Sequence, residues 1–253
     1  MERVPLRSLV EEPYGRVICY PKFDEVELAR RIEELSGLGV HSVEFRGEKE
    51  LFGLPILGKG NVGIVVVAYR RGGPWALKIR RLDADRESLV READLLKLAN
   101  SVGVGPRLIS VSRNFLLMEY IKGRYFLEWL RSMEGGDALV RKVLKGFLKQ
   151  CRALDKIGLD HGELSRAHRH ILVDGLSRPW IVDFETASLT RRVSNVTSLC
   201  QYFFISSEAA HFLKQRLGAV NRKELIRALR RYKRSMTDEN FKEILSVCKL
   251  TGF

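Results

Sequence analysis

The residues best suited to chemistry begin with three glycines, Gly58, Gly60 and Gly63, in the spacing G-x-G-x-x-G. A phosphate group needs backbone N–H donors close to its oxygens, and glycine offers them without an obstructing side chain. The same spacing opens a dinucleotide-binding turn, but there a helix follows the glycines. Here residues 64–67 read Ile-Val-Val-Val, and β-branched residues favour a strand. The stretch therefore predicts a hairpin that covers phosphates, with Val65 packing against the bound nucleotide.

A lysine follows in an apolar strand, Trp75-Ala76-Leu77-Lys78-Ile79. Lysine is rarely buried without an acidic partner, and a strand lysine just after a glycine hairpin is placed to pair with phosphates. Residues 85–100 predict a helix whose core face carries Leu89, Ala93 and Leu96. This helix offers Glu87 and Glu92. We expect Glu92 to be the partner of Lys78, because it lies beside the core face.

Two loops supply carboxylates of a kind that phosphoryl transfer requires. His161-Gly162-Glu163-Leu164 precedes one short strand, and Asp183-Phe184 follows another. Glu163, with His161 beside it, is placed to accept the proton of an acceptor hydroxyl or to orient that hydroxyl. Asp183 is placed to hold Mg²⁺, because magnesium prefers one or two carboxylates together with phosphate oxygens.

The first 50 residues predict a β-α-β-like appendage ahead of the hairpin. Residues 16–20 and 41–45 have the composition of short strands. Between them a helix should begin at Asp24, which forms a capping box with Glu27, and it should end near Gly37 and Gly39. The sequence does not indicate what this appendage does.

The amino-acid composition limits the kinds of binding partner and the cellular compartment that we expect for this protein. The net charge is +13, and residues 190–253 alone carry 13 basic and 5 acidic side chains, which favours a polyanionic partner. No apolar run approaches the length of about 18 residues that suggests a membrane span, and no signal peptide is evident. The four cysteines form no C-x-x-C pair. We expect a cytoplasmic protein without a membrane segment, and nothing indicates a stable protein partner.

Residues 222–234 predict a sharply two-faced helix. Leu225, Leu229 and Tyr232 share one face at helical spacing. The opposite face carries only basic side chains: Lys223, Arg227, Arg230, Arg231 and Arg234. Such a face predicts contact with the phosphate backbone of RNA.

Taken in chain order, the glycine hairpin, Lys78, Met118-Glu119-Tyr120, the Glu163 loop and Asp183-Phe184-Glu185 resemble the archaeal tRNA kinases of the Rio and KEOPS-associated group. The resemblance covers roughly residues 52–215. It implies an α+β, two-lobed protein-kinase-like fold after the N-terminal appendage (residues 1–50), with an N-lobe at 51–121 and a C-lobe at 122–253. It also implies ATP and Mg²⁺ as cofactors, tRNA as partner and a ribose 2′-hydroxyl as acceptor. The adenine would meet the backbone near Glu119 and Ile121.

Three departures from the pattern of the wider Rio and KEOPS-associated group bear on the site; together with the basic surface and the N-terminal appendage, they resemble the archaeal tRNA kinases. Glu163 stands where the group has aspartate, and Glu185 replaces the last glycine of D-F-G. The usual metal-binding asparagine is replaced by either His168 or His170; we expect His170 beside Asp183 at the metal site, although histidine suits magnesium poorly. Arg166 or Arg169 would offset charge on the transferring group. If Glu163 is not the catalytic acid, Asp160 is the first alternative.

Other functions remain open at this point. An atypical Rio-like protein serine/threonine kinase would phosphorylate itself and depend little on RNA. A pseudokinase would bind ATP without transferring phosphate, as the altered acid and asparagine positions suggest. A kinase acting on small amines should have an acidic pocket, and this chain is basic.

Overall fold

The computed structural model describes residues 3–133 and 136–252. The chain folds as α+β and divides into two compact units, Met1–Lys97 with Pro106–Ile121, and Leu98–Gly105 with Lys122–Phe253. Helix α3 (Val90–Ser101) runs through the division, and the chain passes finally into the second unit at Lys122. Among the described residues, no helix is both long enough and apolar enough to cross a membrane.

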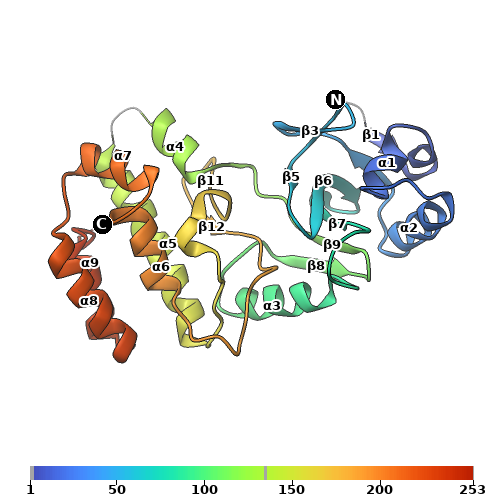
Figure 1. Cartoon of the computed structure of the whole chain (residues 1–253). Helices are drawn as coiled ribbons and strands as arrows, with labels where there is room; N and C mark the ends of the chain where they lie inside the picture. Colours follow the sequence, from blue (N-terminus) through green and yellow to red (C-terminus); the bar gives the residue numbers. More distant parts are fainter. Residues whose placement is uncertain (1–2, 134–135, 253) are drawn as a thin grey trace. The chain divides into compact units, whose positions relative to one another are not determined.

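The first unit is built on an antiparallel seven-stranded sheet in the order β1-β2-β6-β7-β9-β8, with β5 also paired to β6 (Figure 1). Strands β3 and β4 form a separate hairpin. Among the described residues before α3, the first unit also contains one 3₁₀ helix and two α-helices. The bounds are β1 (Arg3–Pro5), η1 (Leu6–Val10), α1 (Tyr14–Ile18), α2 (Glu25–Gly37), β2 (Ser42–Glu44), β3 (Lys49–Leu51), β4 (Leu54–Ile56), β5 (Gly58–Lys59), β6 (Gly63–Arg70), β7 (Gly73–Arg80), β8 (Leu108–Val111) and β9 (Phe115–Glu119).

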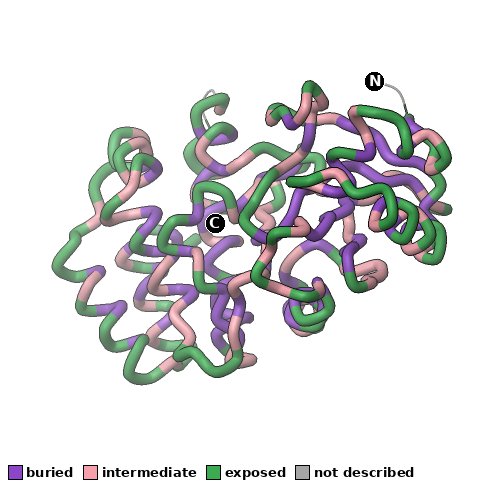
Figure 2. Tube along the Cα trace, turned by 45° about the vertical axis from the view of Figure 1, so that its right-hand side comes forward, coloured by how far each residue is buried: buried purple, intermediate pink, exposed green. Residues whose placement is uncertain are grey.

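Residues 1–50 are not a separate appendage, so that prediction is wrong. Strand β2 pairs with β6, with Val43 opposite Ala68, and β1 pairs with β2. Fully buried side chains of the N-terminal part, such as Ile18 and Leu35, share one core with Ile64 of β6. Buried stretches, purple in Figure 2, alternate with exposed ones along the chain near the N-terminus. These residues are therefore part of the same sheet and core as the glycine hairpin.

A buried arginine ties α2 to the sheet. Arg31 is fully buried and donates to the carbonyls of Ile18 (2.6 Å) and Arg80 (2.8 Å). It also donates to Asn114 Oδ1 (3.2 Å) and to Glu27 Oε1 (2.9 Å). Because each of these acceptors belongs to a different segment, one side chain links the N-terminal helices to β7 and to the turn before β9.

The helix predicted after Asp24 is confirmed, but the strand predicted at residues 16–20 is wrong. The Asp24 side chain accepts from the backbone N–H of Glu27 at 2.8 Å, as expected of an N-cap. Residues 14–18 are instead the short helix α1, whose Gly15 packs so closely that an added Cβ would lie 2.9 Å from Leu28. A short apolar run does not distinguish helix from strand, and here packing against α2 decides it.

The second unit is mainly helical, with a small antiparallel sheet in the order β10-β11-β12. The rings of Phe126, Phe147 and Phe203 meet in its core, with centroids 5.0–5.9 Å apart. Helices α8 and α9 lie side by side (Figure 1). The bounds are β10 (Gly123–Tyr125), α4 (Phe126–Ser132), α5 (Asp137–Lys156), η2 (Leu164–Arg169), β11 (Ile171–Asp174), β12 (Pro179–Ile181), α6 (Asn195–Phe204), α7 (Glu208–Leu217), α8 (Arg222–Arg234) and α9 (Asp238–Val247).

Candidate active site

The glycine stretch forms the predicted hairpin. Gly58 of β5 pairs with Val65 of β6, and the Gly60 N–H donates to the Gly63 carbonyl at 2.8 Å across the turn. A strand follows the glycines, so the stretch is not a dinucleotide-binding turn. A Cβ at Gly63 would lie 2.9 Å from both Lys78 Cγ and the Ile79 carbonyl oxygen. Glycine is therefore needed at 63 so that the lysine side chain can run directly beneath the hairpin.

Lys78 and Glu92 form the predicted ion pair. Lys78 Nζ lies 2.8 Å from Glu92 Oε1, and their side chains are only 5% and 4% exposed. The core face expected for this helix is confirmed, because Leu89, Ala93 and Leu96 are buried. The other acid considered, Glu87, is exposed. The helix begins at Val90 rather than near residue 85. Even so, Glu92, which helical spacing selected, is the acid that pairs with Lys78.

Two side chains that the sequence did not indicate hold the tip of the hairpin. The Lys59 ammonium donates to the Tyr20 hydroxyl at 2.6 Å and also lies over that ring. Arg81 donates to the Gly60 carbonyl at 2.9 Å and pairs with Asp83. Tyr20 lies in the N-terminal part of the chain, so only the folded structure brings it to the hairpin.

The segment predicted to meet an adenine lies at the end of the first unit. Glu119 is the last residue of β9, and Ile121 is the last residue of the unit. The Glu119 N–H already donates to the Arg107 carbonyl at 2.9 Å. A base edge would therefore have to use backbone groups other than this N–H.

In the second unit, His161 is fully buried and positions its neighbours. Its Nε2 lies 3.1 Å from the Val182 carbonyl, which can only accept, so Nε2 carries the proton. Its Nδ1 then accepts from the Glu163 N–H at 3.4 Å. Burial, with the nearby His170 as a second cause, lowers the pKa of His161 from 6.5 to about 4. The buried ring thus contacts the backbone of both the Glu163 and the Asp183 loops, which favours a positioning role, and the catalytic role of His161 stays a prediction.

His170, not His168, lies with the two candidate carboxylates. Its Nε2 is 3.7 Å from Glu163 Oε2, and its Nδ1 is 3.8 Å from Asp183 Oδ2. Burial lowers the pKa of His170, although both carboxylates act in the opposite direction. His168 is exposed on the same segment. Of the two histidines considered, His170 is therefore the one that lies beside both carboxylates.

Asp183 has an unusual backbone conformation for a residue with a side chain. Its φ is +69°, in the left-handed region, which costs energy for residues other than glycine. Phe184 next to it is buried against the His161 ring, with centroids 5.1 Å apart. The buried phenylalanine and the preceding β12 fix this turn, and the Asp183 side chain remains 32% exposed.

The alternative acid, Asp160, is a structural residue. It is buried and forms an ion pair with Arg191. Its Oδ1 also accepts from the Ser194 N–H at 2.8 Å. Gly162, with φ of +94°, leaves room for Arg191, since an added Cβ would lie 2.4 Å from that guanidinium. These contacts occupy Asp160 and remove it as the substitute for Glu163.

The donor set fits a magnesium ion held largely by phosphate. Within residues 3–133 and 136–252, no three His, Cys, Asp or Glu side chains form a complete protein-built metal site. Magnesium bound to a nucleotide needs only one or two carboxylates, and Asp183 meets that requirement. The nearby His170 nitrogen is a poor magnesium ligand, so Asp183 is the residue that would hold the ion.

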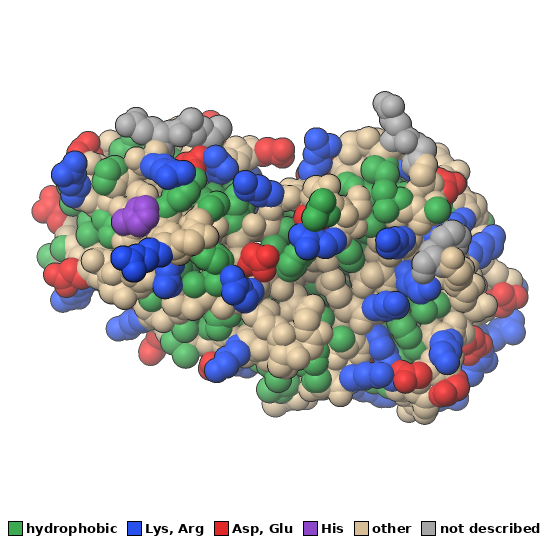
Figure 3. Space-filling model, turned by 180° about the vertical axis from the view of Figure 1, so that it is seen from behind, with side chains coloured by type: hydrophobic (Ala, Val, Ile, Leu, Met, Phe, Trp, Pro, Cys, Tyr) green, Lys and Arg blue, Asp and Glu red, His purple; other side chains and the backbone are tan. Residues whose placement is uncertain are grey.

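The basic helix α8 has the two faces predicted for it. Leu225, Leu229 and Tyr232 are buried, whereas the five basic residues are exposed. Arg231, however, forms an ion pair with Glu243 of α9, so the basic face is not free of acids. On the side of the molecule drawn in Figure 3, Lys and Arg side chains are interspersed with Asp and Glu. Of the five predicted residues, Lys223, Arg227, Arg230 and Arg234 are therefore left for a polyanion.

A scan against models of known protein families finds no match for this chain, and a search of curated proteins finds no significant relative. No activity is therefore inherited from a relative, and the residues and contacts above carry the functional interpretation.

Proposed function

We propose that this protein is an ATP- and Mg²⁺-dependent kinase with a two-lobed, protein-kinase-like fold. It transfers a phosphoryl group to a hydroxyl of RNA, and the ribose 2′-hydroxyl of tRNA is the acceptor. The observation that carries the proposal is the buried Lys78–Glu92 pair beneath the glycine hairpin. Burying two charges costs so much desolvation that such a pair is weak evidence for a role in stability alone. Its place under a hairpin of glycines supports a role in holding phosphates.

The first unit would bind the nucleotide. Backbone N–H groups of the hairpin approach the phosphates, Lys78 pairs with them, and Glu92 fixes the lysine in place. Tyr20 and Arg81 hold the hairpin tip, which reduces the ordering that binding must impose.

The second unit would supply the metal ligand and the acid. Asp183 holds Mg²⁺, which when bound neutralises charge on the phosphate oxygens. Glu163, whose side chain is 30% exposed, accepts the proton of the attacking hydroxyl. The neutral His170 lies between the two carboxylates and keeps them apart without adding a charge.

An RNA acceptor is supported by charge. The C-terminal residues 190–253 carry 13 basic side chains against 5 acidic ones. Four of the basic residues predicted to bind RNA are exposed on α8 and can contact phosphates: Lys223, Arg227, Arg230 and Arg234. Each phosphate contact of this kind adds affinity that falls with salt.

The test is transfer of label from γ-³²P-ATP to total tRNA, with a generic protein substrate in parallel. We expect label in tRNA, and none with Asp183→Asn or Lys78→Ala. Matched controls on the exposed side of α3, Asp94→Asn and Lys97→Ala, should transfer normally. A phosphate on the 2′-oxygen prevents that oxygen from attacking the adjacent 3′ phosphodiester. The phosphodiester bond next to the labelled ribose should therefore survive alkaline hydrolysis. Label only in protein, or full activity in both site variants, would refute the proposal.

A further inference from the structure

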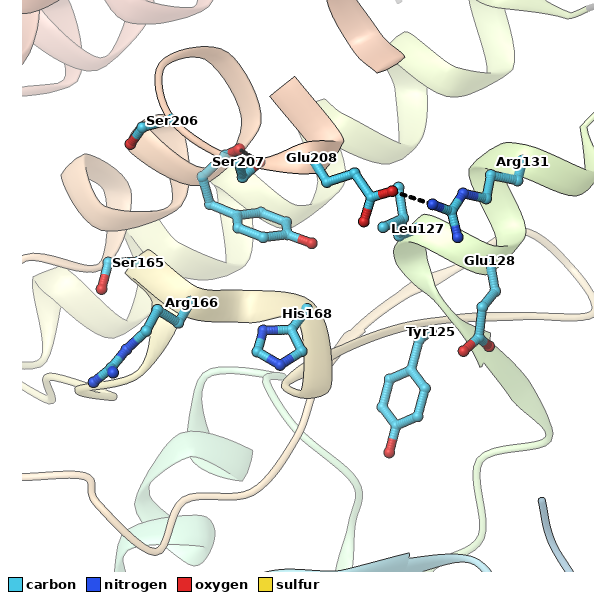
Figure 4. A pocket seen from close by; sticks show the side chains of 11 residues that line it. Tyr125, Leu127, Glu128, Arg131, Ser165, Arg166, His168, Ser206, Ser207 and Glu208 are labelled. Atoms are coloured by element: carbon cyan, nitrogen blue, oxygen red, sulfur yellow. Dashed lines mark hydrogen bonds and ion pairs between the residues drawn. The ribbon is translucent and has the colours of Figure 1, made fainter. Parts of the chain in front are cut away.

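A cavity of about 390 Å³ opens on the second unit, and Arg166 and His168, both considered above, are among its lining residues. It is shown in Figure 4, with η2 on one side and the segments of α4 and α7 around it. Its size is at the lower end of the range, about 300–1,000 Å³, that pockets for small ligands span. Four parts of the chain line it: Tyr125, Leu127, Glu128 and Arg131; Ser165, Arg166 and His168; Tyr202; and Ser206, Ser207 and Glu208.

Tyr202 supplies a polar group with which this cavity could hold a ligand. The side chain lines the cavity, yet the residue is only 4% exposed. Within residues 3–133 and 136–252, no hydrogen bond involves its hydroxyl, and that oxygen is not among the fully buried polar atoms that lack a partner, so it is open to the cavity. Burial, with the charge of Glu208 as a second cause, raises the pKa of Tyr202 to about 12, so the hydroxyl keeps its proton and can donate.

The geometry of η2 links the cavity to the candidate acid. Leu164 and Ala167 of this segment are buried, whereas Ser165 and His168 line the cavity on either side of a kink at Arg166, where the backbone is not helical. Glu163 is the residue at which this segment begins. A group bound along Ser165 and His168 is therefore held by the same short segment that carries the proposed proton acceptor.

The lining chemistry suits one nucleotide of an RNA strand. The ion pair of Arg131 with Glu208 closes one end, as the dashed line in Figure 4 shows, so these two charges neutralise each other. The rings of Tyr125 and His168 offer surfaces on which a base can stack. Arg166 adds a positive charge for a phosphate, and the serine hydroxyls suit the ribose.

We propose that this cavity holds the acceptor nucleotide of the RNA, with its base against His168 and Tyr125 and a polar group on the Tyr202 hydroxyl. This inference rests on the proposed function, because the acceptor must reach Glu163. It also makes a prediction of its own, since the cavity should bind short RNA whether or not transfer occurs.

The test uses two variants and two matched controls. Tyr202→Phe removes only the unpartnered hydroxyl, and His168→Ala removes an exposed ring. The controls are Tyr14→Phe, which loses a hydroxyl in the first unit, and Lys142→Ala, which loses an exposed charge on α5. The measurements are the binding of fluorescent RNA hexamers, A₆ and U₆, without ATP, and the KM for tRNA in the transfer assay.

We expect Tyr202→Phe to weaken hexamer binding and raise the KM about three- to tenfold, the effect of one hydrogen bond. His168→Ala should weaken binding about fivefold or more, as expected for a lost stacking ring. ATP affinity and both controls should match the wild type.

Wild-type hexamer affinity in both variants, or no hexamer binding by the wild type, would overturn the assignment of the cavity. Transfer to tRNA with an unchanged KM in both variants would also overturn it while leaving the proposed function intact. Hexamer binding that depends on Tyr202, but without transfer to tRNA, would support the cavity as a nucleotide site and refute the kinase proposal instead.

Discussion

Replacing Glu92 by glutamine should destabilise the first unit strongly, because it leaves the Lys78 ammonium buried without its carboxylate. The two charged atoms lie 2.8 Å apart, and both side chains are at most 5% exposed. At an effective dielectric constant of about 20, charges at 2.8 Å attract by about 6 kcal/mol. Lysine can lose its proton to limit the loss, and breaking buried pairs costs about 3–5 kcal/mol. We expect the free energy of unfolding to fall by that amount.

The double variant Lys78→Met/Glu92→Leu separates stability from function. Replacing a buried ion pair by apolar side chains of similar size is often neutral or stabilising, since no charge is left to desolvate. We expect the double variant to unfold within about 1 kcal/mol of the wild type or above it. It should nevertheless fail to transfer phosphate, because no ammonium remains for the phosphates.

The assay is urea unfolding followed by circular dichroism, with hydrogen exchange of peptides from β6 and β7 to localise the effect. Glu87→Gln, an exposed acid just before α3, is the matched control and should change neither stability nor transfer. A Glu92→Gln protein as stable as the wild type would refute the electrostatic reasoning. A double variant with normal transfer would refute the role of Lys78.

Three other outcomes are expected. Glu163→Gln should slow transfer on the order of 10²-fold or more, and Glu163→Asp should lose less because a carboxylate survives; steady-state rates check this. Because burial lowers the pKa of His161 from 6.5 to about 4, the unfolded chain binds a proton that the folded protein does not between those values. Stability should therefore fall by about 3 kcal/mol as pH drops through that range, and urea midpoints of His161→Asn should show a flatter pH dependence. Arg227→Ala/Arg230→Ala should reduce the log–log salt slope of tRNA binding by about two units at most, whereas Arg231→Ala, which removes a paired charge, should change it less.

Local sequence patterns predicted the parts of the site that local geometry determines. The glycine spacing followed by β-branched residues predicted the hairpin, and helical spacing selected Glu92 over Glu87 as the partner of Lys78. Both predictions depend on short-range periodicity and on the rule that a buried charge needs a partner.

Features that depend on distant pairing could not be predicted. Residues 1–50 were expected to stand apart, but the pairing of β2 with β6 places them in the main sheet. The contact of Tyr20 with Lys59 follows from that pairing. Likewise, the choice between His168 and His170 depends on the folded segment: His168 lies within η2 and is exposed, whereas His170 is its C-cap and lies beside both carboxylates.

The acids of the second unit illustrate what burial adds to sequence spacing. Asp155 and Asp160 are buried, and each is occupied by several donors, among them Tyr232 and Asn195 for Asp155 and Arg191 for Asp160. Both carboxylates have structural roles, because a ligand could reach them only by displacing those donors. Glu163 and Asp183 are instead 30% and 32% exposed on either side of a neutral histidine. Of these four carboxylates, exposure and partners leave Glu163 and Asp183 as the two that a ligand can reach without displacing a structural donor.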